Sequence, residues 1–209
     1  MVQVDAGSIV PSTRDLLQVL ATKRRSMALV GVIGSESPAE EAARLHDLNV
    51  SALASAEAGP AMALAARATK TVPMLLLPAA GDRDAFLAAR YFGADGVCID
   101  AALALEEWDK LAKNARMTRM LPLALATDDA SIDAAVKSGA RAILVRAASA
   151  DAAIALAAKA PRTITLVAEI AGGDGDALRA LRGHVDAAVV PASIHRAAGF
   201  AALVAELDP

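Results

Sequence analysis

Cysteine is nearly absent from this chain of 209 residues, which contains Cys98 alone. A single cysteine excludes an intramolecular disulfide, and we expect a reducing, cytoplasmic environment. Long apolar runs are also missing, because none reaches the roughly 18 residues that a membrane span needs. The first residues show no basic region followed by an apolar stretch. We therefore expect no signal peptide and no membrane partner.

Aromatic side chains make up only 2% of the residues, and the dispersed charges sum to a formal net charge of −3. A nucleic-acid interface would need stacking aromatics and a wide basic face, so we expect no nucleic-acid partner. The one basic cluster, Lys23-Arg24-Arg25, is interpreted as a solvated helix end. No spacing of the histidines suggests a shared metal, and we expect no metal and no cofactor. The histidines are His46, His184 and His195.

Short apolar segments recur about every 22 residues, and an Ala-rich amphipathic segment follows each of them. Eight strand-helix units in one small domain predict an α/β fold, a (β/α)8 TIM barrel. A doubly wound open sheet is the alternative architecture. The candidate strands are Met27–Ile33, Val50–Ala54, Val72–Leu77, Gly96–Ile99, Leu121–Leu125, Ala142–Val145, Ile164–Ala168 and Ala187–Val190.

The whole chain, 1–209, is predicted to be a single barrel domain, with residues 1–26 as an N-terminal extension and helix. Ser12 or Thr13 is expected to begin that helix, which runs to about Thr22 and covers the bottom of the barrel. A helix–Gly–strand turn recurs along the chain, with glycine expected in the left-handed conformation. These glycines are Gly93, Gly139 and Gly183.

Chemistry in such barrels lies in the loops after the strands. The loop after the third strand, Leu77-Pro78-Ala79-Ala80, offers no acid, base or nucleophile. Polar or flexible residues follow the first, sixth, seventh and eighth strands: Ser35, Ser37, Arg146, Glu169, Gly172, Gly173 and Ser193. Cys98 is expected in the core, Trp108 in the core or an interface, and His195 at the surface.

Six segments of the chain resemble indole-3-glycerol phosphate synthase. They are Gly34-Ser35-Glu36-Ser37, Val72-Pro73-Met74-Leu75, Ala85–Asp95, Ser138-Gly139-Ala140-Arg141, Val167-Ala168-Glu169 and Asp186–Ser193. The resemblance spans most of residues 12–207 and implies a phosphate-binding barrel with a lyase ancestry. Phosphoribosylanthranilate isomerase fits less well, because its family needs a cysteine at the end of the first strand, whereas Cys98 lies in the fourth.

The reactive lysines of the synthase family align with Val32 and Leu77, its acidic residue on the fifth strand with Leu125, and its asparagine after the sixth with Arg146. Valine and leucine cannot donate or accept a proton, so we expect no synthase activity. Glu169 is the one reactive residue that the resemblance retains.

The resemblance makes Ser193 and one of the loop serines, Ser35 or Ser37, candidate phosphate contacts. Ser193 is alternatively an ordinary helix N-cap. Arg146 and Glu169 are either a ligand-binding pair or a salt bridge in the space that the lysines leave, and Arg146 could also bind a phosphate. The stretch Gly172-Gly173-Asp174-Gly175 either cradles phosphate or forms a mobile turn.

Two functional hypotheses follow. In the first, the chain is a degenerate barrel that binds a small phosphorylated ligand, or a protein partner or second copy through its Ala-rich helices, especially Ala150–Ala160. In the second, it is an active lyase or isomerase acting on a phosphorylated intermediate of tryptophan-type biosynthesis. Glu169 would then be the general acid or base, with Arg146 and Ser193 holding the phosphate.

Overall fold

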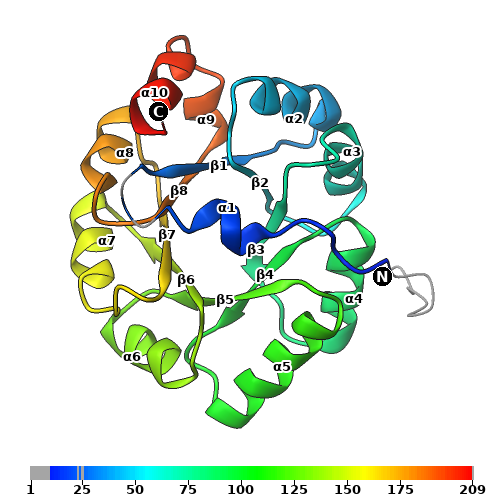
Figure 1. Ribbon diagram of the computed structural model, residues 1–209, viewed down its shortest axis with the longest axis vertical. Coiled ribbons are helices and arrows are strands. Elements are labelled where there is room, and N and C mark those ends of the chain that lie inside the picture. The colour runs from blue at the N-terminus through cyan, green and yellow to red at the C-terminus, as the bar shows by residue number, and fades with distance from the viewer. Residues whose placement is uncertain (1–9, 23, 25, 209) are drawn as a thin grey trace.

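The computed structural model describes residues 10–22, 24 and 26–208, so Lys23 and Arg25 of the basic cluster lie outside the described residues. Its strands form a closed parallel barrel in sequence order (Figure 1). Each predicted segment overlaps one strand, which confirms the (β/α)8 barrel and excludes the open sheet. The strands are β1 (Ala28–Val32), β2 (Ala52–Ser55), β3 (Met74–Ala79), β4 (Gly96–Asp100), β5 (Leu121–Ala126), β6 (Ala142–Ala147), β7 (Thr165–Ile170) and β8 (Ala187–Val190).

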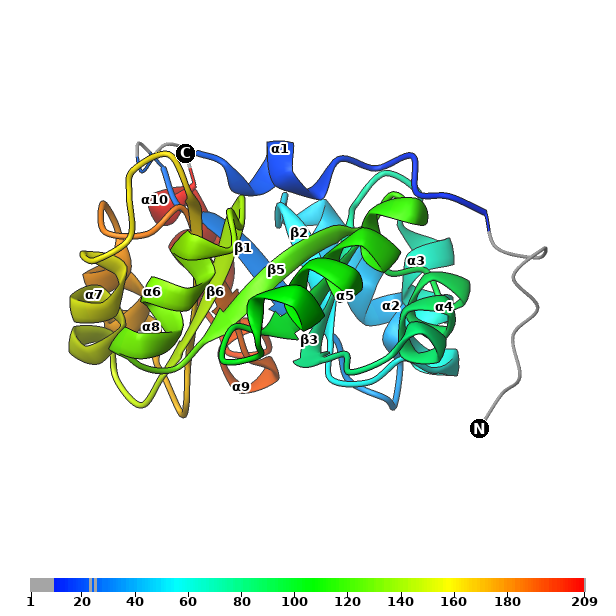
Figure 2. The same ribbon diagram turned by 90° about the horizontal axis from the view of Figure 1, so that it is seen from below.

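Helices surround the barrel, except α1, which lies across one end of it, and α9, which lies at the opposite end (Figures 1 and 2). Within the described ranges, no helix combines the length and apolar character needed to cross a membrane. The helices are α1 (Leu16–Leu20), α2 (Pro38–Asp47), α3 (Pro60–Ala68), α4 (Arg83–Tyr91), α5 (Leu105–Met117), α6 (Asp129–Lys137), α7 (Ala150–Ala157), α8 (Gly175–Leu181), α9 (Ala192–His195) and α10 (Phe200–Leu207).

The inside of the barrel is filled by every second residue of the strands, because side chains alternate between the two faces of a sheet. Many of these residues are small or aliphatic, and Cys98 is fully buried among them as predicted. Leu16 and Leu20 of α1 join this cluster from below. The N-terminal helix therefore covers the bottom of the barrel, as the sequence predicts.

The start of α1 differs from the prediction. Asp15, and neither Ser12 nor Thr13, caps the helix, and its carboxylate accepts from the Gln18 N–H at 3.0 Å. The Ser12 hydroxyl instead donates to the carboxylate of Asp95. The local capping signal was outweighed by this contact with a residue 83 positions away.

The helix–Gly–strand turns are confirmed, with φ of 108° at Gly93, 69° at Gly139 and 84° at Gly183. Two of these turns share a further feature. The buried carboxylate of Asp95 accepts the N–H of Met74, the first residue of β3, at 2.8 Å. The buried carboxylate of Asp186 accepts the N–H of Leu166, the second residue of β7, at 2.9 Å. Each carboxylate thus fixes the register of two neighbouring strands at the N-terminal end of the barrel.

Candidate functional site

The carboxyl ends of the strands form the mouth of the barrel. Inward-facing positions there include Val32, Leu77 and Leu125, which pack on the apolar barrel interior. Two charged side chains, Arg146 and Glu169, share this layer and are 38% and 25% exposed. The positions that align with the synthase family's lysines are thus apolar in space as well as in sequence.

Arg146 and Glu169 are paired neighbours on β6 and β7, and they form an ion pair with 2.7 Å between Nε and Oε2. The Arg146 Nη2 also donates to the Leu77 carbonyl at 3.3 Å. Because β4 and β5 lie between β3 and β6, the arginine side chain spans the barrel mouth. The pairing of β3 with β4 shifts between Leu76 and Ala79, next to Pro78, which has no N–H to donate. Arg146 therefore bridges an irregular strand end to the opposite wall.

Below this pair, Cys98 is buried inside the barrel, and burial raises the pKa of its thiol to about 12. Such a thiol stays protonated at neutral pH, so it is no nucleophile. Among the described residues, no group of three His, Cys, Asp or Glu side chains is placed to hold a metal ion.

A cavity of about 470 Å³ lies between the β7–α8 loop and the segment after β8. Gly173 and Ser193 both line it, so the structure brings together two of the predicted phosphate contacts. Gly172 has a φ of 65° and turns the chain after β7. Within the described part of the chain, the N–H groups of Gly172, Gly173 and Ser193 have no hydrogen-bond acceptor. These amides are free donors beside a cavity.

The interpretation of Ser193 as a helix N-cap is wrong. Pro191 is the N-cap residue of α9 and makes no side-chain capping bond, whereas the exposed Ser193 lies inside the helix. Pro191 after β8 sets the helix start two residues earlier than a cap at Ser193 would.

Ser35 and Ser37 are exposed in the β1–α2 loop and do not line the cavity that contains Gly173 and Ser193. Ser37 instead borders a hollow that it shares with several carboxylates and two arginines. The charged residues at that hollow are Glu36, Glu40, Glu41, Arg44 and Arg196. The structure therefore places these serines apart from the cavity of Gly173 and Ser193, which is itself lined by one carboxylate, Asp174, and one arginine, Arg179.

His195, expected at the surface, is completely buried. Its Nε2 donates to the Val32 carbonyl at 2.7 Å, and its Nδ1 accepts from Arg44 Nη2 at 2.9 Å. Arg44 Nη1 also donates to the His195 carbonyl at 2.9 Å. Burial lowers the pKa of His195, which agrees with the neutral ring that this pattern of donors and acceptors requires. The histidine connects α9 to β1 and α2.

Glu41 of α2 adds a second link to α9, through Arg196 at the end of that helix. Burial alone would raise the pKa of Glu41, but the hydrogen bonds from Arg196 and from the Gly34 N–H outweigh burial, and the pKa of the carboxyl lies below its usual value. The Arg196 Nε donates to Glu41 Oε1 at 2.7 Å. The sequence contains a signal for this residue, because Glu41 shares the buried face of α2 with Pro38, Ala42 and Leu45.

No model of a known protein family matches the chain, and no curated protein matches it. Solved structures share its fold. A 3-hexulose-6-phosphate synthase is 17% identical with a TM-score of 0.68, over 87% of this chain and 98% of that chain. The N-acetylmannosamine-6-phosphate 2-epimerase from Clostridium perfringens is 13% identical with a TM-score of 0.69, over 88% and 92%. The thiamine phosphate pyrophosphorylase from Pyrococcus furiosus is 17% identical with a TM-score of 0.62, over 89% and 99%. These likenesses show a TIM-barrel fold, and they do not single out indole-3-glycerol phosphate synthase.

Proposed function

We propose that the chain binds a phosphorylated small molecule at the barrel mouth, with the phosphate in the cavity between the β7–α8 loop and α9. The observation that carries this proposal is the shared cavity of Gly173 and Ser193, beside backbone N–H groups that have no acceptor among the described residues. Unpaired backbone amides are the donors that phosphate oxygens accept in many proteins.

The position of the cavity supports this proposal. Phosphate sites in TIM barrels frequently lie at the loops after the seventh and eighth strands, beside a short extra helix. Here the short α9 follows β8 and meets the loop after β7. The enzymes of the three similar structures are each named after a phosphorylated compound, which adds support by analogy of fold.

The Arg146–Glu169 ion pair lies on β6 and β7 at the barrel mouth and would face the body of the ligand. We favour ligand binding over a lyase or isomerase activity, because the Glu169 carboxylate is already engaged by Arg146. Val32 and Leu77 supply no proton donor in place of the synthase family's lysines. A protein partner or second copy at Ala150–Ala160 stays a prediction.

Calorimetric titration with ribose 5-phosphate and with ribose tests the proposal. We expect saturable binding of the phosphate ester and none of the sugar. Gly173→Asp should weaken binding at least about tenfold, because it adds a negative charge beside the phosphate. The variant should still fold, since a Cβ at Gly173 comes no closer than 3.4 Å to a neighbour, the Ile170 side chain.

Gly81→Asp is the matched control, because a Cβ at Gly81 meets no atom within 4 Å and the residue follows β3 rather than β7. Equal binding of ribose and its phosphate, or an equal loss in both variants, would overturn the proposal. A turnover assay with the carboxyphenylamino-deoxyribulose phosphate of the synthase reaction should give no product. Product that disappears in Glu169→Gln would instead support the lyase hypothesis.

A further inference from the structure

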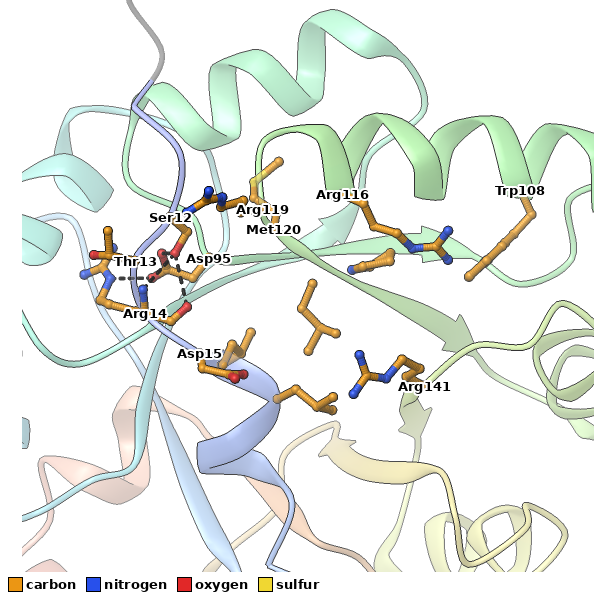
Figure 3. A pocket seen from close by; sticks show the side chains of 14 residues that line it. Ser12, Thr13, Arg14, Asp15, Asp95, Trp108, Arg116, Arg119, Met120 and Arg141 are labelled. Carbon is orange, nitrogen blue, oxygen red and sulfur yellow. Dashed lines mark hydrogen bonds and ion pairs between the residues drawn. The ribbon is translucent and has the colours of Figure 1, made fainter.

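A second pocket, of about 420 Å³, lies at the end of the barrel opposite the mouth, between α1, α5 and the start of β5 (Figure 3). It is independent of the function proposed above. Arg116 comes from α5 and Arg141 from the residue before β6, and both lie beside β5 (Figure 3). Arg119 lines the same pocket. Among the described residues, none of these three arginines has a carboxylate partner within 4.0 Å.

The acidic residues of the pocket do not neutralise these arginines. Asp95 is held by Arg14 at 2.7 Å and by Arg90 at 2.8 Å, so its charge is already balanced. Asp15 caps α1 through the Gln18 N–H. The remaining charge of the pocket is therefore positive, in a chain whose net charge is −3.

Trp108 also lines the pocket and is 1% exposed. Its indole Nε1 has no hydrogen-bond partner among the described residues, although a buried indole usually finds one. The Nε1 atom itself is buried, so the groups that face an occupant are the exposed guanidinium groups, which can only donate hydrogen bonds. An occupant that satisfies them must be rich in acceptors and negatively charged.

The backbone at Arg119 gives an independent indication. Arg119 has a φ of 58° and follows the C-cap of α5, the turn position that glycine occupies after α4, α6 and α8. Arginine rarely adopts this left-handed conformation, whereas glycine adopts it readily. The chain thus carries an arginine in a left-handed conformation beside the pocket, at a position where three other turns carry glycine and the turn after α2 carries Asn49.

We propose that this pocket binds a small organic oxyanion, a carboxylate or a phosphate monoester, through Arg116, Arg119 and Arg141. The planar guanidinium matches both kinds of oxyanion in a bidentate way. Leu16, Leu17 and Met120 supply an apolar wall, so the occupant has an apolar body as well as a charged group. The volume lies in the range of small-molecule sites, and the exposed arginines leave the pocket open to solvent.

Trp108 is the only tryptophan of the chain, so its fluorescence reports on this pocket directly. We expect a saturable change in its emission on titration with benzoate or phenyl phosphate, and none with the uncharged benzyl alcohol. The two anions distinguish a carboxylate from a phosphate preference. No saturation with either anion up to about 10 mM would overturn the proposal.

Arg116→Gln and Arg141→Gln should each weaken binding about tenfold, whereas Lys110→Gln, an exposed residue of the same helix, should leave it unchanged. Arg119→Gly should weaken binding while keeping or raising the melting temperature, a combination that a purely structural arginine would not give. Unchanged binding in all three arginine variants, or an equal loss in Lys110→Gln, would contradict the site. Gly173→Asp should leave this titration unaltered, so binding at this pocket is distinguished from binding at the proposed mouth site.

Discussion

His195 is a buried residue whose ionisation links stability to pH. Burial lowers its pKa in the folded chain below the ordinary value of 6.5. The unfolded chain therefore binds a proton more readily, and the free energy of unfolding falls as pH drops below about 6.5 through the folded pKa. The lowered pKa of Glu41 acts in the same direction. Its contribution to the free energy of unfolding is present above the ordinary glutamate pKa of 4.5 and is lost as pH falls through the folded pKa.

Urea unfolding of the parent chain and of His195→Gln at several pH values measures this linkage. At pH 8 the variant should be about 1–2 kcal/mol less stable, because the bonds to Val32 and Arg44 are disturbed. Between about pH 7 and 5.5 its free energy of unfolding should depend less on pH than that of the parent. The exposed His46→Gln should keep the parent's pH dependence. An identical slope in His195→Gln would show that this histidine does not carry the effect.

At the scale of elements, α1 depends on a glycine at the bottom of the barrel. A Cβ at Gly96 would collide with the Leu16 side chain and come within 3.2 Å of Leu123 Cδ1. Gly96→Ala should therefore destabilise the chain by about 1–3 kcal/mol through overpacking. Leu16 is 2% exposed, and Leu16→Ala should cost about 2–5 kcal/mol by leaving a cavity.

A double variant that combines Gly96→Ala with Leu16→Ala tests whether the losses of stability in the two single variants share a cause. In the Leu16→Ala background, the added methyl group of Gly96→Ala has room, so its further cost should be smaller than in the parent. Thermal and urea unfolding of the four chains gives this coupling. Strictly additive losses would mean that α1 does not enter the barrel beside Gly96.

At the scale of the whole molecule, the barrel was predictable because its signals are local. Each strand is a short apolar run, and Gly93, Gly139 and Gly183 mark turns by conformations that glycine favours. Cys98 was also correctly predicted to be buried, and Trp108 lies in the core, one of its two predicted places. These features depend on composition and on neighbours in sequence.

The details of the site were not predictable in the same way, because they depend on closure of the barrel. The partners of His195 lie about 150 and 160 residues earlier, on α2 and β1, and no local pattern marks the histidine as buried. The Arg146 contact with the Leu77 carbonyl likewise needs β3 and β6 on opposite walls. Ser12 has the residue type of a helix cap, and only the folded barrel brings Asp95 next to its hydroxyl.

The most direct test of phosphate binding at the mouth is an amide ¹H–¹⁵N spectrum of the full chain, titrated with ribose 5-phosphate. The account predicts the largest, saturable shifts at the amides of Gly172, Gly173 and Ser193, with none on titration with ribose. Shifts confined to residues around Trp108 and Arg141, or no shifts at all, would contradict a phosphate site at the barrel mouth.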